Sequence, residues 1–501
     1  MFILNLETKI TASDGATKDG FGEQLSLNGN ILVVGSFLDD DNGDRSGSVY
    51  IFERVNRTWK EISKLTPSDG AAGDFFGDTI KINGNTALIG SWGDDDNGDF
   101  SGSVYIFEKV DGVWKETTKL TPSDGAPEDL FGISFDQNGT DGNVIMVGNW
   151  KDDDNSSDSG SVYILKKVAG VWTEQEKIYA SDGAKEDEFG RFIDINDTKA
   201  IIGALNGDGN EKNSGAAYIF EEVDEKWKET AKLTPSDGEE GDLFGRVVKI
   251  NDKTAIVGSP RNNNKQGAAY IFEEVDGEWK ETAKLTASDG ADGDGFGASV
   301  ALKDDILVVA SRYDDDNGED SGSVYVYEKI DGNWTEIEKI VAPDGEAGDV
   351  FGKRLDINGN NLVVGSFLDD DNLVNSGSVY LYKFDRAGNR FQNARDFGVL
   401  DPLSPPQTFS DWVGLEDQRD FFRFELKEST SNFELTLDGL NDNANVFLVN
   451  LEQKFFASSR NERNTSEVIS ANLDPGVYHI LVRSDYEDGN PATDYQLTLS
   501  F

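Results

Sequence analysis

Short stretches in which apolar and polar residues alternate run through the first 385 residues of the chain. One stretch, DTIKINGNTALIGSW (78–92), has an alternating segment, a Gly-Asn pair and a short apolar run. The next, SGSVYIFEKVDGVWKETTKL (101–120), alternates on both sides of an Asp-Gly pair. Alternation with a period of two predicts half-buried strands, and these dipeptides are typical of two-residue hairpin turns. Residues 78–120 are therefore predicted to form four antiparallel strands.

This four-strand pattern recurs at intervals of 52 to 58 residues, most often 55. The dipeptide Phe-Gly marks each copy, and its phenylalanines are Phe21, Phe76, Phe131, Phe189, Phe244, Phe296 and Phe351. A tryptophan follows in register in six of the copies, from Trp59 to Trp334. No apolar periodicity of helical length competes with this interpretation. Seven copies of four antiparallel strands predict a seven-bladed β-propeller.

The two ends of the repeat region predict how the ring closes. Leu4 lies 55 residues before Trp59, so residues 2–11 align with the fourth strand of a copy. The N-terminal strand is expected to complete the last blade, beside the strand that ends at Phe384. Residues 393–501 show short alternating segments separated by Asn, Asp, Gly and Pro, a pattern that predicts a β-sandwich. We therefore predict an all-β chain, with a propeller over 1–392 and a small sandwich over 393–501.

The repeats resemble a known family. The copy GDFFGDTIKINGNTALIGSWGDDDNGDFSGSVYIFE (73–108) is similar to the bacterial branch of FG-GAP repeats, which build the propeller of integrin α-subunits. The resemblance implies a non-enzymatic, extracellular or cell-surface protein that binds calcium and serves adhesion. The segments FSDWVGLEDQRDFFRFEL (409–426) and SEVISANLDPGVYHILV (466–482) resemble the bacterial pre-peptidase C-terminal domain, a small β-sandwich.

One departure from the integrin-type repeat affects the metal prediction. The integrin calcium loop resembles D-x-D-x-D-G-x-x-D and lies between the first two strands of a repeat. Here that place holds only INGN (82–85) and its equivalents, which are too short. The integrin calcium site is therefore not carried over to this chain.

Acidic loops after the second strand of a copy are the candidate cation sites instead. In an antiparallel blade, this loop and the loop into the next blade lie on the same face. Aspartates at alternate positions offer the hard oxygen ligands that Ca²⁺ prefers. The alternative is that Asp, Asn and Gly only make Asx-turns and keep the face hydrated. The candidate ligands are Asp39, Asp41, Asp44, Asp94, Asp96, Asp99, Asp152, Asp154, Asp314, Asp316, Asp369 and Asp371.

Aromatic residues stand next to these acids. Phe37, Trp92, Trp150 and Phe367 each follow the glycine of the second strand by two residues, and Tyr313 lies near the equivalent place. On an exposed face such rings stack on sugars or on the cationic side chains of a partner. They are the candidate ligand-binding residues, for a protein or carbohydrate ligand. The alternative is that they fill the gaps between blades.

Composition narrows the function classes. The chain has 95 acidic and 46 basic residues and a formal net charge of −49, which argues against a nucleic-acid partner and suits cation binding. It contains no cysteine and one histidine, His479, so the predicted propeller holds no Ser-His or Cys-His pair. No apolar run reaches the ~18 residues of a membrane helix. The N-terminus shows no signal-peptide pattern.

Together these features predict a non-enzymatic adhesion or binding protein, extracellular or at the cell surface, with no catalytic residues. Two alternatives remain at this stage. One is a polysaccharide hydrolase or lyase that uses carboxylates with Tyr313 or Arg312 in the central depression. The other is a structural component of an extracellular matrix.

Overall fold

The computed structural model describes residues 3–55, 58–138, 142–330, 332–385, 394–400, 406–413, 419–440, 444–450, 455–459, 465–484 and 493–500. It divides the chain into two compact units: one holds residues 8–358 and 362–381, and the other holds residues 382–501 with 1–7 and 359–361. The predicted boundary between residues 392 and 393 falls outside the described residues. Among the described residues, no helix is long and apolar enough to cross a membrane.

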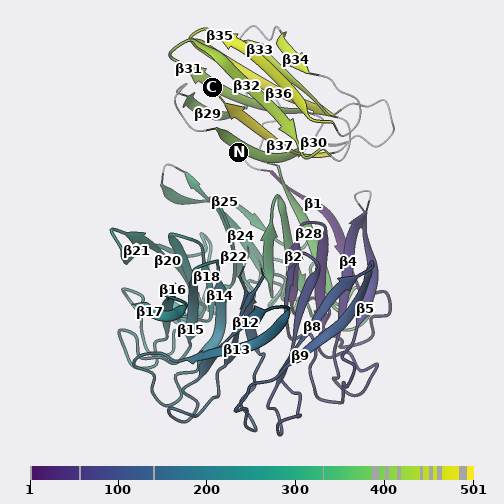
Figure 1. Ribbon diagram of the computed structural model, residues 1–501, viewed down its shortest axis with the longest axis vertical. Helices are drawn as coiled ribbons and strands as arrows, with labels where there is room; N and C mark the ends of the chain where they lie inside the picture. Colours follow the sequence, from purple (N-terminus) through teal and green to yellow (C-terminus); the bar gives the residue numbers. More distant parts are fainter. Residues whose placement is uncertain are drawn as a thin grey trace. The chain divides into compact units, whose positions relative to one another are not determined.

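Strands β1 to β28 form seven four-stranded sheets, which are the blades of a propeller (Figure 1). Blades one to three contain β2 (Leu25–Asn28), β3 (Ile31–Ser36), β4 (Ser48–Val55), β5 (Thr58–Leu65); β6 (Thr79–Asn83), β7 (Thr86–Ser91), β8 (Ser103–Val110), β9 (Val113–Leu120); and β10 (Ser134–Gln137), β11 (Val144–Asn149), β12 (Ser161–Val168), β13 (Val171–Ile178). Within each of these blades, consecutive strands pair antiparallel.

The remaining four blades repeat this order. They contain β14 (Phe189–Ile195), β15 (Lys199–Ala204), β16 (Ala216–Val223), β17 (Lys226–Leu233); β18 (Val247–Ile250), β19 (Thr254–Ser259), β20 (Ala268–Val275), β21 (Glu278–Leu285); β22 (Phe296–Lys303), β23 (Ile306–Ser311), β24 (Ser323–Ile330), β25 (Asn333–Ile340); and β26 (Leu355–Asn358), β27 (Asn361–Ser366), β28 (Ser378–Asp385) with β1 (Ile3–Ile10). Blade five also carries a short turn, labelled α1 (Asn262–Lys265), between β19 and β20, in which Asn263 and Asn264 have positive φ.

The ring closes with the first strand of the chain. The sheet order β1-β28-β27-β26 places β1 beside β28, in the position that the outer strand holds in the other six blades. This pairing covers the hydrogen-bonding edge of β28, which an unclosed ring would expose. The first strand of every blade lines the central channel, where a cavity of about 130 Å³ is bordered by residues of all seven.

Neighbouring blades meet through the Phe-Gly motif. The Phe76 ring is fully buried and packs edge-on against Tyr105 and Phe107, with centroids 5.5 and 6.0 Å away. Its backbone N–H donates to the carbonyl of Ser46 in the preceding blade, at 3.1 Å. Gly47 follows Ser46 with φ +80°, and a Cβ there would lie 2.1 Å from the Phe76 carbonyl oxygen. Glycine is therefore needed where two blades touch backbone to backbone.

The C-terminal unit is a sandwich of two sheets, with strand orders β29-β31-β36-β33-β34 and β30-β37-β32-β35. Their inward residues form one core that includes Phe422, Phe424, Leu435, Ile480 and Leu497. The strands are β29 (Arg395–Leu400), β30 (Gln407–Val413), β31 (Arg419–Leu426), β32 (Thr430–Asp438), β33 (Ala444–Asn450), β34 (Phe455–Ser459), β35 (Glu467–Leu473), β36 (Gly476–Ser484) and β37 (Thr493–Ser500). The predicted all-β fold, a seven-bladed propeller followed by a small sandwich, is confirmed.

The blade contact at Gly47 generates a stability prediction. Gly47→Ala is expected to lower the free energy of unfolding by roughly 3 kcal/mol or more, because its methyl group meets rigid backbone of the next blade. Gly84→Ala is the matched control, since Gly84 also has a positive φ but nothing lies within 4 Å of its Cβ position. The control is expected to cost about 1 kcal/mol in urea denaturation. Equal losses for the two variants would contradict the proposed blade contact.

Candidate functional site

A lysine from the outer strand lies at the centre of each acidic loop. In blade two, Lys119 Nζ lies 2.8, 2.7 and 2.6 Å from carboxylate oxygens of Asp69, Asp94 and Asp96. The Tyr105 hydroxyl oxygen lies 2.8 Å from a carboxylate oxygen of Asp69 and 2.7 Å from one of Asp94, so its single proton is shared between these two acceptors. The ammonium also lies 5.0 Å from the centre of the Tyr105 ring. One cation and one hydroxyl thus connect two loops to the two outermost strands of the blade.

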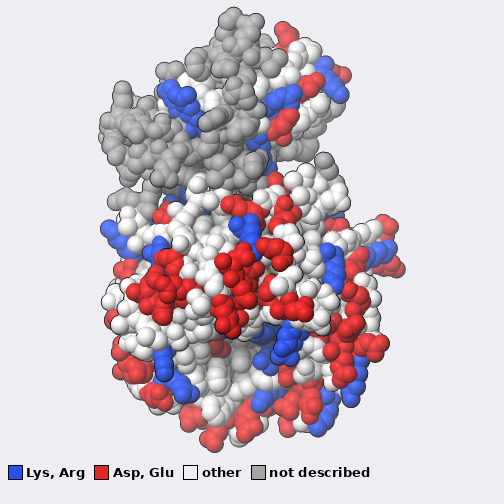
Figure 2. All heavy atoms as spheres, turned by 180° about the vertical axis from the view of Figure 1, so that it is seen from behind, with Lys and Arg blue, Asp and Glu red and all other residues white. Residues whose placement is uncertain are grey.

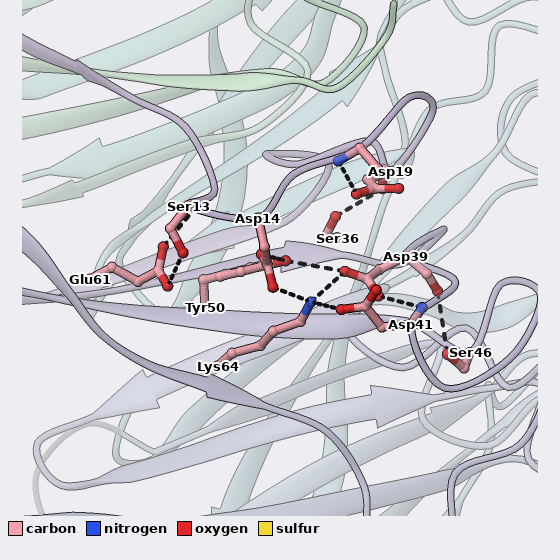
Figure 3. A network of polar contacts seen from close by, with 11 residues as sticks. Ser13, Asp14, Asp19, Ser36, Asp39, Asp41, Ser46, Tyr50, Glu61 and Lys64 are labelled. Carbon is pink, nitrogen blue, oxygen red and sulfur yellow. Dashed lines mark hydrogen bonds and ion pairs between the residues drawn. The ribbon is translucent and has the colours of Figure 1, made fainter. Parts of the chain in front are cut away.

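We call this arrangement the lysine tether. It recurs with three aspartates in blades one, two, three, six and seven, where the lysine–carboxylate distances run from 2.5 to 3.1 Å. Figure 3 shows it in blade one, with the Lys64 ammonium between Asp14, Asp39 and Asp41. The lysines are Lys64, Lys119, Lys177, Lys339 and Lys9, and the aspartates from the Ser-Asp-Gly or Pro-Asp-Gly loops are Asp14, Asp69, Asp124, Asp289 and Asp344.

The pKa values of Lys119 and Asp69 are shifted in the directions that keep both groups charged. Burial alone would lower the pKa of Lys119, but its hydrogen bonds to the three aspartates outweigh burial and raise the pKa above its usual value. Burial would likewise raise the pKa of Asp69, yet the hydrogen bonds from Lys119 and Tyr105 hold it below the ordinary range. Lys119 and Asp69 are therefore held in their charged forms, and their half-buried, hydrogen-bonded ion pair is worth more than an exposed one.

Blades four and five keep the lysine but lose most of the acids. Lys232 contacts Asp182 at 2.6 Å and the backbone carbonyl of Asp208 at 2.7 Å. Lys284 contacts Asp237 at 2.6 Å and the side-chain oxygen of Asn262 at 2.8 Å. One carboxylate and one neutral oxygen replace three carboxylates in these two blades. The lysine is thus the constant element of the tether, and the acidic loops vary around it.

The structure brings together some of the predicted calcium ligands and separates others. Asp94 and Asp96 both contact Lys119, and in four other blades the equivalent aspartates both contact the lysine of their own blade. The backbone N–H of Asp96 also donates to Asp94 at 3.2 Å, in an Asx-turn. Asp44 and Asp99 lie outside these groups and are exposed. Their backbone carbonyls instead accept from Gly73 and Glu128, in the loop that leads into the next blade.

The tether residues that the sequence interpretation missed carry a recognisable signal. Each lysine is the second-last residue of an outer strand, as in the Lys-Leu of β5 and β9 and the Lys-Ile of β1. Each tyrosine is the third residue of its strand, in Ser-Val-Tyr or Ala-Ala-Tyr. All seven of these tyrosines are at most 1% exposed. Their shared register with the Asp-containing loops marks them as one unit.

The predicted aromatic residues fall into two groups. Phe37 and Trp92 belong to a row that also contains Phe75 and Phe100, with ring centroids 6.3, 4.3 and 5.9 Å apart along the row. Phe75 and Phe100 have φ of 54° and 57°, a region that bulky residues rarely adopt, and Phe100 is 43% exposed. We call these four residues the aromatic row. It crosses from blade one to blade two.

The other three predicted rings pack against cations. The Arg191 guanidinium lies 4.1 Å from the Trp150 ring centre, Arg312 lies 4.7 Å from Tyr313, and the Lys353 ammonium lies 4.6 Å from Phe367. Each ring thus has a charged neighbour, and one of these neighbours, Arg191, borders the central cavity. Tyr313 is 37% exposed.

The residue that follows Phe-Gly differs in the sign of its charge from blade to blade. This position holds Glu23 and Asp78 in blades one and two, but Arg191 and Arg246 in blades four and five. Burial, followed by the repulsion of Glu23, raises the pKa of Asp78 to about 7. Figure 2 shows the wider setting, in which Asp and Glu side chains form dense patches over the propeller and Lys and Arg lie among them. The basic residues at this position in blades four and five are therefore an exception in a strongly acidic protein.

Comparison with known proteins decides the family. The model of the FG-GAP repeat matches seven segments, residues 4–52, 59–107, 114–165, 172–220, 227–272, 279–327 and 334–382. The chain belongs to the FG-GAP repeat family. Each matched segment starts on the outer strand of one blade and ends on the third strand of the next, so sequence repeats and blades are offset by one strand.

The C-terminal unit of this FG-GAP repeat protein matches a second family, and parts of the chain are similar to known proteins. Residues 418–484 match the bacterial pre-peptidase C-terminal domain. Integrin alpha-6 of Homo sapiens is 28% identical over 177 residues, 32% of this chain, and that of Gallus gallus is 29% identical over 160 residues, 28% of this chain. The chain matches 14% of the length of each integrin. The pre-peptidase C-terminal domain of a collagenase from Bacillus anthracis is 19% identical, with a TM-score of 0.17, over 21% of this chain and 93% of that domain.

The lysine tether leads to a second stability prediction. Lys119→Gln removes the cation from Asp69, Asp94 and Asp96 and is expected to lower the free energy of unfolding by about 2 kcal/mol. Lys232→Gln is the matched control, because its lysine contacts one carboxylate and is expected to cost less than about 1 kcal/mol. Urea denaturation at pH 7 measures both. A loss for Lys232→Gln as large as that for Lys119→Gln would contradict the prediction that the cost grows with the number of carboxylates that lose the ammonium.

Proposed function

We propose that this FG-GAP repeat protein is a non-enzymatic extracellular or cell-surface binding protein, and that the aromatic row is its ligand-contacting surface. The integrin-like repeats support an adhesion role. The observation that carries the proposal is the row itself: four rings, each next to the following one, across two blades and on the face that bears the acidic loops. Two of the rings stand on backbone with positive φ, a conformation that the repeat adopts at these two positions in every blade.

The chemistry of this surface suits a protein or carbohydrate ligand. Ring faces stack on the apolar faces of sugars or on cationic side chains, and the acids beside them accept hydrogen bonds from hydroxyls or ammonium groups. The tethers keep these loops in place before a ligand arrives, so binding requires little ordering of the surface. Rigid loops on a closed ring are well suited to recognition.

Binding through the aromatic row is tested by substitution. Trp92→Ala is expected to weaken the affinity for a ligand identified on glycan and matrix-protein arrays by at least about tenfold, as a central aromatic contact does. Trp172→Ala, on outer strand β13, is the control and is expected to leave that affinity within twofold. Melting curves confirm that both variants fold. New reducing ends or unsaturated sugars in the same incubations would contradict the non-enzymatic proposal and support the hydrolase or lyase alternative.

The calcium binding expected from the sequence at the acidic loops has a competitor in the lysine tethers. An ion held by Asp69, Asp94 and Asp96 would take the place of the Lys119 ammonium, which already contacts all three within 2.8 Å. The positive charge of Lys119 already balances part of the negative charge of these carboxylates. We infer that lysine, rather than calcium, is their resident counter-ion, and that a calcium site here requires the lysine to leave.

A calcium titration separates the two counter-ions. Wild-type protein, treated with a chelator, is expected to show a shift in melting temperature below about 1 °C at 2 mM Ca²⁺. Lys119→Gln frees three carboxylates and is expected to gain several degrees under the same conditions, with Mg²⁺ as the ionic control. A shift of several degrees in the wild type would instead support resident calcium in the loops.

A further inference from the structure

Blades four to six hold a basic pocket that the proposed function does not use. An open pocket of about 520 Å³ is lined by Arg191, Arg246, Arg261, Lys265 and Arg312, and its single acidic lining residue is Glu188. Five cations against one carboxylate is unusual in a chain with net charge −49. We call this the basic pocket. It adjoins the stretch where the acidic loops themselves change, at residues 206–213 and 261–266.

These cations stand at two kinds of position in the repeat: directly after Phe-Gly, and in the segment that follows the second strand of a blade. Arg191 and Arg246 follow the Phe-Gly of blades four and five, and Arg312 follows the last residue of β23 in blade six. Arg261 and Lys265 come from the segment between β19 and β20, where blade five has lost its acidic run. Three neighbouring blades therefore direct positive charge to one pocket, while Glu23 and Asp78 occupy the Phe-Gly position in blades one and two.

The central arginines lack the partners that such groups ordinarily have. Arg191 pairs with Glu188 at 2.8 Å. Among the described residues, no carboxylate lies within ion-pair distance of Arg246 or Arg312, and the buried Nε of Arg312 has no hydrogen-bond acceptor. Burial, together with repulsion by Arg312 and Arg191, lowers the pKa of Arg246 to about 9. Like charges held together without counter-charge are unfavourable, and an anion would relieve this cost.

Aromatic rings hold the guanidinium groups. Arg191 stacks on Trp150 at 4.1 Å, Arg312 on Tyr313 at 4.7 Å, and Arg246 lies 5.2 Å from the Phe192 ring centre. Stacking restrains the planar guanidinium while its edge N–H groups stay available for bidentate contacts with an oxyanion. The pocket is thus prepared for a charged ligand, with Tyr313 offering an exposed ring in the same lining.

We propose that the basic pocket binds an acidic sugar unit, such as a uronic acid residue of a polysaccharide. Its carboxylate would lie against Arg246 and Arg312, neither of which has an acid partner among the described residues, and its pyranose ring beside Tyr313. A volume of about 520 Å³ is that of a small-molecule pocket and holds one or two sugar units, whereas an acidic peptide needs an extended groove. The proposal goes beyond the function proposed above, because it concerns a second site in blades four to six.

Titration calorimetry with digalacturonate, and with its methyl ester as the neutral counterpart, tests this proposal on the full chain. Wild-type protein is expected to bind the acid at least tenfold more tightly than the ester, with an affinity that falls as salt rises. Arg312→Gln and Arg246→Gln are each expected to weaken binding by about 10- to 100-fold, the effect of losing a charged hydrogen bond. Arg45→Gln, the same charge change on an exposed loop of blade one, is expected to change it less than twofold.

Further variants and ligands separate loss of binding at the basic pocket from misfolding and from loss of the aromatic row. Without ligand, Arg246→Gln is expected to melt no lower than the wild type, since it removes like-charge repulsion, and this excludes misfolding as a cause of lost binding. Trp92→Ala is expected to bind digalacturonate normally, so failure of the aromatic row and failure of the basic pocket are distinguishable. Absence of wild-type binding, insensitivity to both arginine variants, or equal affinity for hexaglutamate or sulfate would overturn the assignment to an acidic sugar.

Discussion

The ion pair between an outer-strand lysine and the aspartates of two loops is the interaction on which the rest of the propeller face depends. Strand pairing within a four-stranded blade does not by itself hold long acidic loops in one conformation. In blade two Lys119 does so, because it contacts one aspartate of the loop that leads into the blade and two of the loop after β7. The hydroxyl of Tyr105, whose ring is buried in the blade core, contacts two of these carboxylates, those of Asp69 and Asp94.

This constraint explains how so acidic a chain keeps a rigid face. Each tether neutralises part of its own loop, and the remaining acids, such as Asp95 and Asp99, are exposed to water. The loops are then free to differ in what they present. In blades one and two they support aromatic rings, and in blades four and five they have given up acids beside a basic pocket. One repeated scaffold thus carries two surfaces of different chemistry.

Much of the fold was predictable from the sequence, because its signals are local and repeated seven times. Phe-Gly spacing, hairpin dipeptides and alternating strands define blades, and the register of Leu4 with Trp59 places β1 beside β28. The tether was not predicted, because a lysine at the second-last position of an exposed strand looks like an ordinary surface residue. Only the return of that strand to the loop face brings Lys119 to Asp94. The basic pocket was hidden for a related reason: its arginines come from three blades, and the net charge of −49 obscures them.

The most direct measurement is a crystal structure at about 1.5 Å from protein grown in 5 mM Ca²⁺, with anomalous data collected for the metal. The lysine tether predicts that Lys119 Nζ lies within about 3 Å of Asp69, Asp94 and Asp96, with no anomalous peak between them. A calcium ion at that centre with six or more oxygen ligands, and Lys119 turned to solvent, would contradict the account.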